Sequence, residues 1–323
     1  MGGSMNKLSG RKKYFNVYGV KVIVEAEYNY EFLQQLDVEY GMFEIMEQFQ
    51  KYDISFVVES KLSCGGEVLI TKCGNRMAIQ EKKIFFGGIN INNPLFYIDD
   101  FRPYFTSVIY YNLVLLRNVF MIHSASYSMN GKGYMIIGDS GCGKSSLTLA
   151  NILSGGKYLS NDITYLGEKE DKIKIWGLPQ VMNLGDLALE WFLREMEKEF
   201  WRFCKVESEY RYNKKPKTCI SLNKEKIENL EEDLKYIIFP EKDLNADEPR
   251  YEFIDISCAF PKILSQIKTF DKPGFRKGID TKIYLSNLEK LFNKMESKIT
   301  FVVFYWTKNH KKNIDVLKKI CTD

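Results

Sequence analysis

The sequence predicts an α/β fold, and three observations lead to this prediction. From about residue 101 onward, short apolar runs alternate with segments whose apolar residues recur every three or four positions, as in amphipathic helices. One apolar run leads into a glycine-rich loop that is followed by a helical pattern. The first hundred residues hold mostly short strand-like runs with glycine pairs between them. We therefore predict a small β-rich domain over residues 5–100 and an α/β domain over residues 101–323.

Composition narrows the class of protein. Of the 323 residues, 45% are hydrophobic, which is enough for a sizeable core. The net charge of +4 is too small to predict a nucleic-acid partner. No run approaches the roughly 20 apolar residues of a membrane span, so we predict no membrane contact. The seven cysteines are scattered without a C-x-x-C pair, and there are only two histidines. This pattern predicts reduced thiols in a cytoplasmic protein and no zinc site.

The first domain is predicted from strand runs and turns. Partial alternation over residues 14–24 indicates a strand, or a hairpin around Gly19. Residues 39–52 have helical spacing, the alternative being a mixed structure. Further short strands are expected at residues 54–58, 68–70 and 83–86. None of these segments carries residues with evident chemistry.

The boundary to the second domain is expected within residues 93–103, which include Pro94 and Pro103. A buried helix is predicted over 104–117, and a strand over 120–128 is joined by a turn at 130–133 to a strand over 134–137. Further strands are expected at 158–160, 172–176, 234–239 and 299–306, and helices at 187–203, 285–295 and 314–320. Asp186 is the expected N-cap of the helix over 187–203. Pro240 is expected to stop the strand over 234–239.

The segment Gly138 to Ser145 reads G-x-x-x-x-G-K-S, the pattern of a phosphate-binding loop. Glycines allow the backbone N–H groups to point inward at phosphate oxygens, and the following helix adds its positive N-terminus. Lys144 would reach the outer phosphates, and the Ser145 hydroxyl would hold Mg²⁺. The residues predicted to bind the nucleotide are Gly138, Asp139, Ser140, Gly141, Cys142, Gly143, Lys144, Ser145 and Ser146.

Phosphoryl transfer also needs a carboxylate near Mg²⁺. The later strands, which end at Phe239 and Trp306, have no Asp at their tips, whereas Asp162 follows a short strand just past the loop helix. Asp162 could hold Mg²⁺ directly or through water, the alternative being a solvated turn carboxylate. His123 lies on the strand expected to pair with the one entering the loop. It would then lie near the transferred phosphate, unless it is a core histidine of the hairpin.

These pieces together resemble the HPr kinase/phosphorylase family. That family shows a His on the preceding strand, a G-x-S-G-x-G-K-S loop and an acidic pair soon after the loop helix. This chain has His123, the loop with matching Ser140 and Gly141, and then Asn161-Asp162. Residues 174–183 resemble, with one residue more, the family signature E-I-R-G-x-G-x-x-N. The resemblance covers about residues 120–185.

The resemblance implies a kinase that uses ATP and Mg²⁺ to phosphorylate a serine hydroxyl of a peptide or protein. It implies His123, Lys144 and Asp162 as catalytic residues, Ser145 and Asp162 as metal ligands, and a homo-oligomer, since family members form hexamers. Asn161 stands where the family has the Asp that acts as base, and Asn cannot take up a proton.

Two further departures concern the signature segment. Lys174 and Trp176 replace its Glu and Arg. These changes favour a divergent relative such as the kinases of lasso peptide clusters, which act on a precursor peptide. The basic run Lys214, Lys215 and Lys217 could hold an acidic peptide, the alternative being a solvated loop.

Two other functions stay open. The protein could be a kinase for a small molecule, which a deep closed pocket would favour. It could also be a nucleotide-binding regulatory module without transfer activity, which Asn161 favours.

Overall fold

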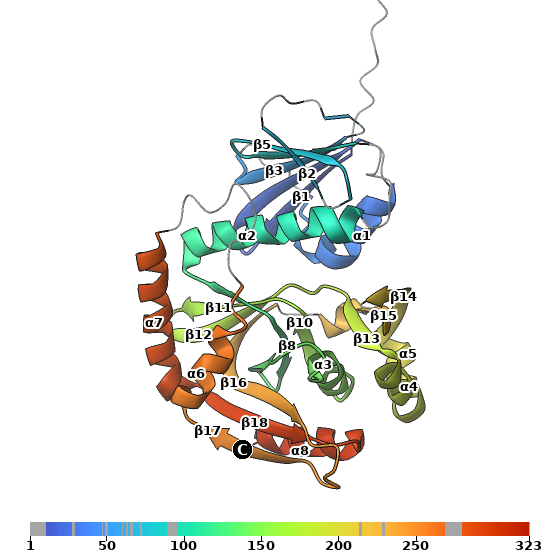
Figure 1. The fold of residues 1–323 in the computed structure, drawn as a ribbon, viewed down its shortest axis with the longest axis vertical. Helices are drawn as coiled ribbons and strands as arrows, with labels where there is room; N and C mark the ends of the chain where they lie inside the picture. The colour runs from blue at the N-terminus through green and yellow to red at the C-terminus, as the bar shows by residue number, and fades with distance from the viewer. Residues whose placement is uncertain are drawn as a thin grey trace, which may run out of the picture. The chain divides into compact units, whose positions relative to one another are not determined.

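The computed structural model describes residues 11–322, apart from 28–29, 47, 49–50, 60, 63, 65–66, 72, 89–95, 213–214, 228–229 and 269–279. The chain forms a mixed α/β structure with three sheets, and its contacts divide it into two compact units (Figure 1). None of the described helices is long and apolar enough to cross a membrane.

The first unit contains a six-stranded mixed sheet and two main helices. The sheet order is β1-β2-β3-β6-β5-β4. The strands are β1 (Arg11–Val17), β2 (Val20–Ala26), β3 (Ile54–Glu59), β4 (Val68–Ile70), β5 (Arg76–Gln80) and β6 (Lys83–Gly87). The helices are α1 (Tyr30–Tyr40) and α2 (Arg102–Arg117), the latter preceded by a π-helical turn, Phe96–Phe101.

Helix α2 belongs to the first unit, so the units divide between Leu116 and Arg117 rather than at the expected boundary between residues 100 and 101. The reason is aromatic packing. Phe105 on α2 is fully buried, with ring centroids 6.1 Å from Phe15 on β1 and 5.2 Å from Phe56 on β3. The apolar face of α2 is therefore covered by the first sheet.

The prediction of a helix over residues 39–52 is wrong. Helix α1 ends at Tyr40, and only a 3-10 turn, Gly41–Phe43, follows. The buried apolar side chains of α1 are Phe32, Leu33, Leu36 and Tyr40. This three-and-four spacing continues past Tyr40 in the sequence, but Gly41 favours termination of the helix there.

The second unit is built on a nine-stranded sheet. Seven strands follow the order β10-β8-β9-β16-β12-β11-β7, while β18 pairs with β16 and β17 pairs with β18. These strands are β7 (Phe120–Ile122), β8 (Ser124–Met129), β9 (Lys132–Ile137), β10 (Lys157–Ser160), β11 (Thr164–Lys169), β12 (Lys172–Gly177), β16 (Glu231–Lys242), β17 (Arg250–Ile254) and β18 (Thr300–Trp306). A separate three-stranded sheet has the order β13-β15-β14, with β13 (Met182–Gly185), β14 (Cys204–Tyr212) and β15 (Lys215–Leu222).

Helices cover both faces of the large sheet, and each face has its own core. The helices are α3 (Lys144–Leu153), α4 (Asp186–Glu195), α5 (Glu197–Phe203), α6 (Ile256–Leu264), α7 (Thr281–Lys298) and α8 (His310–Thr322). Side chains of α3, α4, α5 and α8 share one core with Tyr134 and Ile136 of β9. Side chains of α6 and α7, which lie together in Figure 1, share the other core with Met135 and Ile137 of the same strand. Strand β9 is therefore buried on both faces, as a central strand is.

Several predicted elements of this unit differ in detail. The strand expected over 120–128 is broken at His123, because β7 pairs with β11 whereas β8 pairs with β9 and β10. Strand β16 does not stop at Pro240 but continues to Lys242. Beyond Ile238 it pairs with β18 and no longer with β9, and proline is tolerated at such an edge.

The segment around residues 186–217 also differs from the prediction. The helix expected over 187–203 is divided at Met196 into α4 and α5, and Gly185 rather than Asp186 is the N-cap. Of the basic run, Lys214 lies outside the described residues, while Lys215 and Lys217 belong to strand β15 rather than to a loop.

Candidate active site

The glycine loop, residues 138–143, connects the end of β9 to the start of α3. Two of its glycines adopt backbone angles that other residues rarely take, with φ of +85° at Gly141 and +106° at Gly143. Gly143 is the N-cap of α3, and its carbonyl accepts the first helical hydrogen bond, 2.9 Å from Leu147 N. The N–H groups at the start of α3 therefore face the loop, which favours an anion there.

Trp306, the last residue of β18, packs against this loop. Its indole Nε1 donates a hydrogen bond of 2.8 Å to the carbonyl of Cys142. A Cβ added to Gly143 would lie 3.2 Å from the indole ring. Burial raises the pKa of the Cys142 thiol despite the opposing charge of Lys144, so the thiol stays protonated at neutral pH. No sequence pattern assigned Trp306 to the site.

Lys144 is held over the loop. Its side chain is only 7% exposed, and Nζ donates hydrogen bonds to the carbonyls of Gly138 at 2.6 Å and Asp139 at 3.1 Å. Ser145 and Ser146, the next two residues of α3, are half-buried. A buried ammonium and the helix N-terminus thus place positive charge at the same end of α3.

His123 lies between β7 and β8, and Gln266 anchors it. The His123 N–H donates to the Gln266 carbonyl at 2.8 Å, and His123 Nδ1 lies 3.0 Å from Gln266 Oε1. The amide nitrogen of the same glutamine donates to Asp139 Oδ1 in the glycine loop at 3.1 Å. Gln266 is 9% exposed. This side chain connects two sequence-predicted site residues, yet no motif in the sequence marks it.

The charges of two other predicted site residues, Lys144 and Asp162, act on His123. Burial lowers the pKa of His123, and the charges of Lys144 and Lys268 lower it further. The Asp162 carboxylate and the hydrogen bond with Gln266 act in the opposite direction. His123 is therefore neutral at pH 7, with Lys144 and Asp162 close enough for their charges to act on it.

Asp162 follows β10, and a ring of three hydroxyl groups fixes the backbone beside it. Ser126 Oγ lies 2.8 Å from Ser160 Oγ, Ser160 Oγ lies 2.7 Å from Thr164 Oγ1, and Thr164 Oγ1 donates to Ser126 Oγ at 3.0 Å. All three residues are fully buried. The ring joins β8, β10 and β11 and so holds the short connection from Asn161 to Ile163 between them.

Asn161 is buried in that connection with 1% exposure. Neither polar atom of its side chain has a hydrogen-bond partner among the described residues. Leaving a buried amide without a hydrogen-bond partner is costly. Its carbonyl oxygen is of the ligand type that Mg²⁺ accepts.

The residues at the loop fit a magnesium ion that is bound together with phosphate. In the described part of the chain, no group of three His, Cys, Asp or Glu side chains could hold a metal ion. Mg²⁺ does not require such a cage, because it binds one or two protein oxygens and completes its shell with phosphate and water. The Ser145 hydroxyl and the Asp162 carboxylate are partly exposed and would be the residues to supply those oxygens.

The signature-like segment has a structural role. Lys174 Nζ pairs with Asp233 at 2.8 Å and Glu231 at 3.2 Å, and Trp176 Nε1 donates to Glu231 at 2.9 Å. Gly177 permits close contact of backbones, since an added Cβ would lie 2.1 Å from the Leu159 carbonyl oxygen. The segment therefore supports β10, the strand that leads to Asp162.

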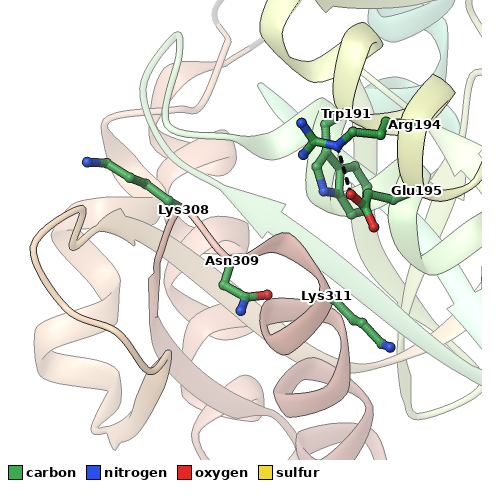
Figure 2. A pocket seen from close by; sticks show the side chains of 6 residues that line it. All are labelled: Trp191, Arg194, Glu195, Lys308, Asn309 and Lys311. Atoms are coloured by element: carbon green, nitrogen blue, oxygen red, sulfur yellow. Dashed lines mark hydrogen bonds and ion pairs between the residues drawn. The ribbon is translucent and has the colours of Figure 1, made fainter.

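A surface cavity of about 420 Å³ lies in the second unit. Figure 2 shows its lining: Trp191, Arg194 and Glu195 come from α4, Lys308 and Asn309 follow β18, and Lys311 is on α8. None of these is a sequence-predicted site residue. Its single carboxylate, Glu195, already accepts a hydrogen bond of 2.8 Å from Arg194. The groups suited to chemistry lie at the glycine loop instead.

No protein-family model matches this chain, and no curated protein matches it. Among solved structures the chain is similar to the HPr(Ser) kinase/phosphatase from Coxiella burnetii, with 10% sequence identity and a TM-score of 0.34. The match covers 62% of this chain and 88% of that one. Because the overlap is loose and the identity low, the function proposed below rests on the residues at the glycine loop.

Proposed function

We propose that the protein is an ATP-dependent kinase that transfers a phosphoryl group to a serine hydroxyl of a peptide or protein. One observation carries the proposal: a buried lysine lies over a glycine loop at a helix N-terminus, and the charges of that lysine and of Asp162 act on the same histidine. Phosphoryl transfer depends mainly on positioning and charge stabilisation, and these residues supply both.

Each residue has a defined task in this proposal. Loop N–H groups and the Lys144 ammonium would bind phosphate oxygens. Ser145 and Asp162 would hold Mg²⁺, which when bound neutralises charge on the phosphate groups. His123 would orient the transferred group.

Two observations concern the acceptor. The kinases that residues 120–185 resemble include some that modify precursor peptides, and Lys217 is a partly exposed cation at the start of β15. A precursor peptide encoded beside the gene is therefore the first acceptor to test.

The test uses Mg²⁺, γ-labelled ATP and that peptide, with wild type and Asp162→Ala compared by mass spectrometry. We expect the peptide to gain one phosphate with wild type and none with Asp162→Ala. Asp247→Ala is the matched control, because Asp247 is an exposed carboxylate away from the loop in the sequence, and it should keep full activity. If the peptide stays unmodified while another hydroxyl compound is phosphorylated, the peptide assignment is wrong and a small-molecule kinase is established.

A second candidate is a nucleotide-binding regulatory module without transfer activity. Asn161 favours it, because the buried amide cannot accept a proton. Calorimetric binding of ATP without any turnover, with affinity lost in Lys144→Met, would support this function over the kinase.

A further inference from the structure

The Gln266 amide can take only one orientation. An aspartate carboxylate only accepts hydrogen bonds, so the amide atom 3.1 Å from Asp139 Oδ1 must be the NH₂ group. The carbonyl Oε1 therefore faces His123 Nδ1, at 3.0 Å. A carbonyl oxygen cannot donate, so Nδ1 must carry the hydrogen. In a neutral imidazole this leaves the lone pair on Nε2.

The backbone around Gln266 holds this arrangement in place. Ile267 forms an antiparallel bridge with Ile122, and the Lys268 N–H donates to the Met121 carbonyl at 2.8 Å. The His123 N–H donates to the Gln266 carbonyl, so histidine and glutamine are joined through both main chain and side chain. The imidazole is thus fixed in position as well as in tautomer.

We propose that Gln266 is a positioning residue that holds neutral His123 with its hydrogen on Nδ1, so that Nε2 accepts the proton of the acceptor hydroxyl. The second half of this statement rests on the proposed kinase function. Asn161 cannot take up a proton, and the Asp162 carboxylate would be engaged with Mg²⁺. Nε2 of His123 is then the available base among the residues that the structure brings to the loop.

The hydroxyl oxygen forms a bond to the γ-phosphorus of ATP, and the bond from that phosphorus to the bridging oxygen breaks. The hydroxyl proton moves to His123 Nε2, and ADP leaves. The imidazolium then releases its proton to water, giving phosphorylated acceptor, ADP and one proton.

The groups around His123 suit a base. Lys144 from α3 and Lys268 from the segment after α6 disfavour the imidazolium, while Asp162 after β10 favours it. Asp139 of the glycine loop reaches the ring only through Gln266. The net effect keeps the ring neutral at pH 7, so Nε2 is ready to accept a proton.

¹⁵N NMR of the full-length protein reports the tautomer directly. Only two histidines are present, so His310→Gln assigns the signals of His123. We expect wild type to show a protonated Nδ1 and an unprotonated Nε2. Gln266→Met, which removes the amide, should shift the ring toward the Nε2–H form preferred in water. Asp139→Asn should give both tautomers, because Asn can donate and lets the Gln266 amide turn over.

Ser265→Ala is the control, since it removes a secondary contact of the Gln266 amide at 3.3 Å and a bond of 2.8 Å to the Lys262 carbonyl but neither bond that orients the amide, so it should leave the His123 tautomer unchanged. A wild-type spectrum with the hydrogen on Nε2 would overturn the role of Gln266. Kinetics then test the base: Gln266→Met should lower kcat about tenfold or more with little change in KM for ATP. Unchanged kcat would overturn the base. Absence of any transfer by wild type would overturn the base and the kinase together, while the spectrum would still decide the role of Gln266.

Discussion

Trp306 and Cys142 are joined by a hydrogen bond of 2.8 Å from the indole Nε1 to a main-chain carbonyl. This bond connects the end of β18 with the glycine loop, and the same ring lies against Gly143. The loop therefore depends on a strand that is separated from it by more than half of the second unit's sequence. The fold contributes to the shape of the loop as much as the glycines do.

We expect Trp306→Phe to weaken ATP binding by about fivefold, because it keeps an aromatic ring beside Gly143 but removes a hydrogen bond worth roughly 1 kcal/mol. Isothermal titration calorimetry measures the affinity. Trp201→Phe is the matched control, since that indole is 54% exposed on α5 and its replacement should leave binding unchanged. Equal affinity for Trp306→Phe and wild type would show that the Cys142 bond does not shape the loop.

Gly177→Ala should destabilise the protein by about 3 kcal/mol, because the new methyl group would meet the Leu159 carbonyl oxygen at 2.1 Å. The atoms that the methyl group would meet belong to the backbone of Leu159, so turning a side chain cannot relieve the clash. Urea unfolding followed by circular dichroism gives the change in free energy. In Gly185→Ala the added atom finds only Lys217 Nζ, at 3.9 Å, so this control should lose far less. Similar losses in both variants would contradict the close approach of β12 to β10.

The hydroxyl ring predicts non-additive effects. Ser160→Ala leaves Ser126 and Thr164 each without one partner and should cost about 1–3 kcal/mol of unfolding free energy. The triple replacement Ser126→Ala, Ser160→Ala and Thr164→Val removes all three hydroxyls and should cost less than the sum of the three single changes. Denaturant titrations of the four variants provide the comparison, and strict additivity would exclude a coupled ring.

The lowered pKa of His123 predicts an acid-sensitive stability. The unfolded chain takes up a proton near pH 6.5, its ordinary value, whereas the folded protein does so only at lower pH. The free energy of unfolding should therefore fall as the pH decreases from 6.5 toward the folded pKa, and this contribution should be constant above 6.5. The slope between about pH 7.5 and about pH 5.5 should be smaller in His123→Gln and unchanged in His310→Gln. Identical slopes in all three proteins would contradict the burial of His123.

The part of the candidate site that sequence could predict is the part that is continuous in the chain. Strand, glycine loop and helix follow one another from Lys132 to Leu153, and the loop contains the two positive-φ glycines Gly141 and Gly143. Gln266 could not be found this way, because it is a single glutamine after an amphipathic helix, 143 positions from its partner His123. Trp306 could not be found from the sequence either, since a tryptophan at the end of an apolar strand has the pattern of a core residue.

The fold shows the same division. The hairpin around Gly19 and helix α2 were predictable from local periodicity, and β18 from its apolar run. The break at His123 was not, because both halves of the segment are apolar and only their pairing partners differ. Strand β16 can extend past Pro240 because β9 no longer pairs with it there, and no local pattern in the sequence encodes this change of partner.

The long separation between His123 and Gln266 has a consequence for how the protein is made. During synthesis the glycine loop leaves the ribosome well before residue 266, so Lys144 can reach its loop carbonyls while His123 still lacks its anchor. Closing so distant a contact is slow relative to forming the local strand, loop and helix. A nascent chain would thus form the local strand, glycine loop and helix first, whereas the contact of Trp306 with the loop and the anchor of His123 by Gln266 both wait until the chain is nearly complete.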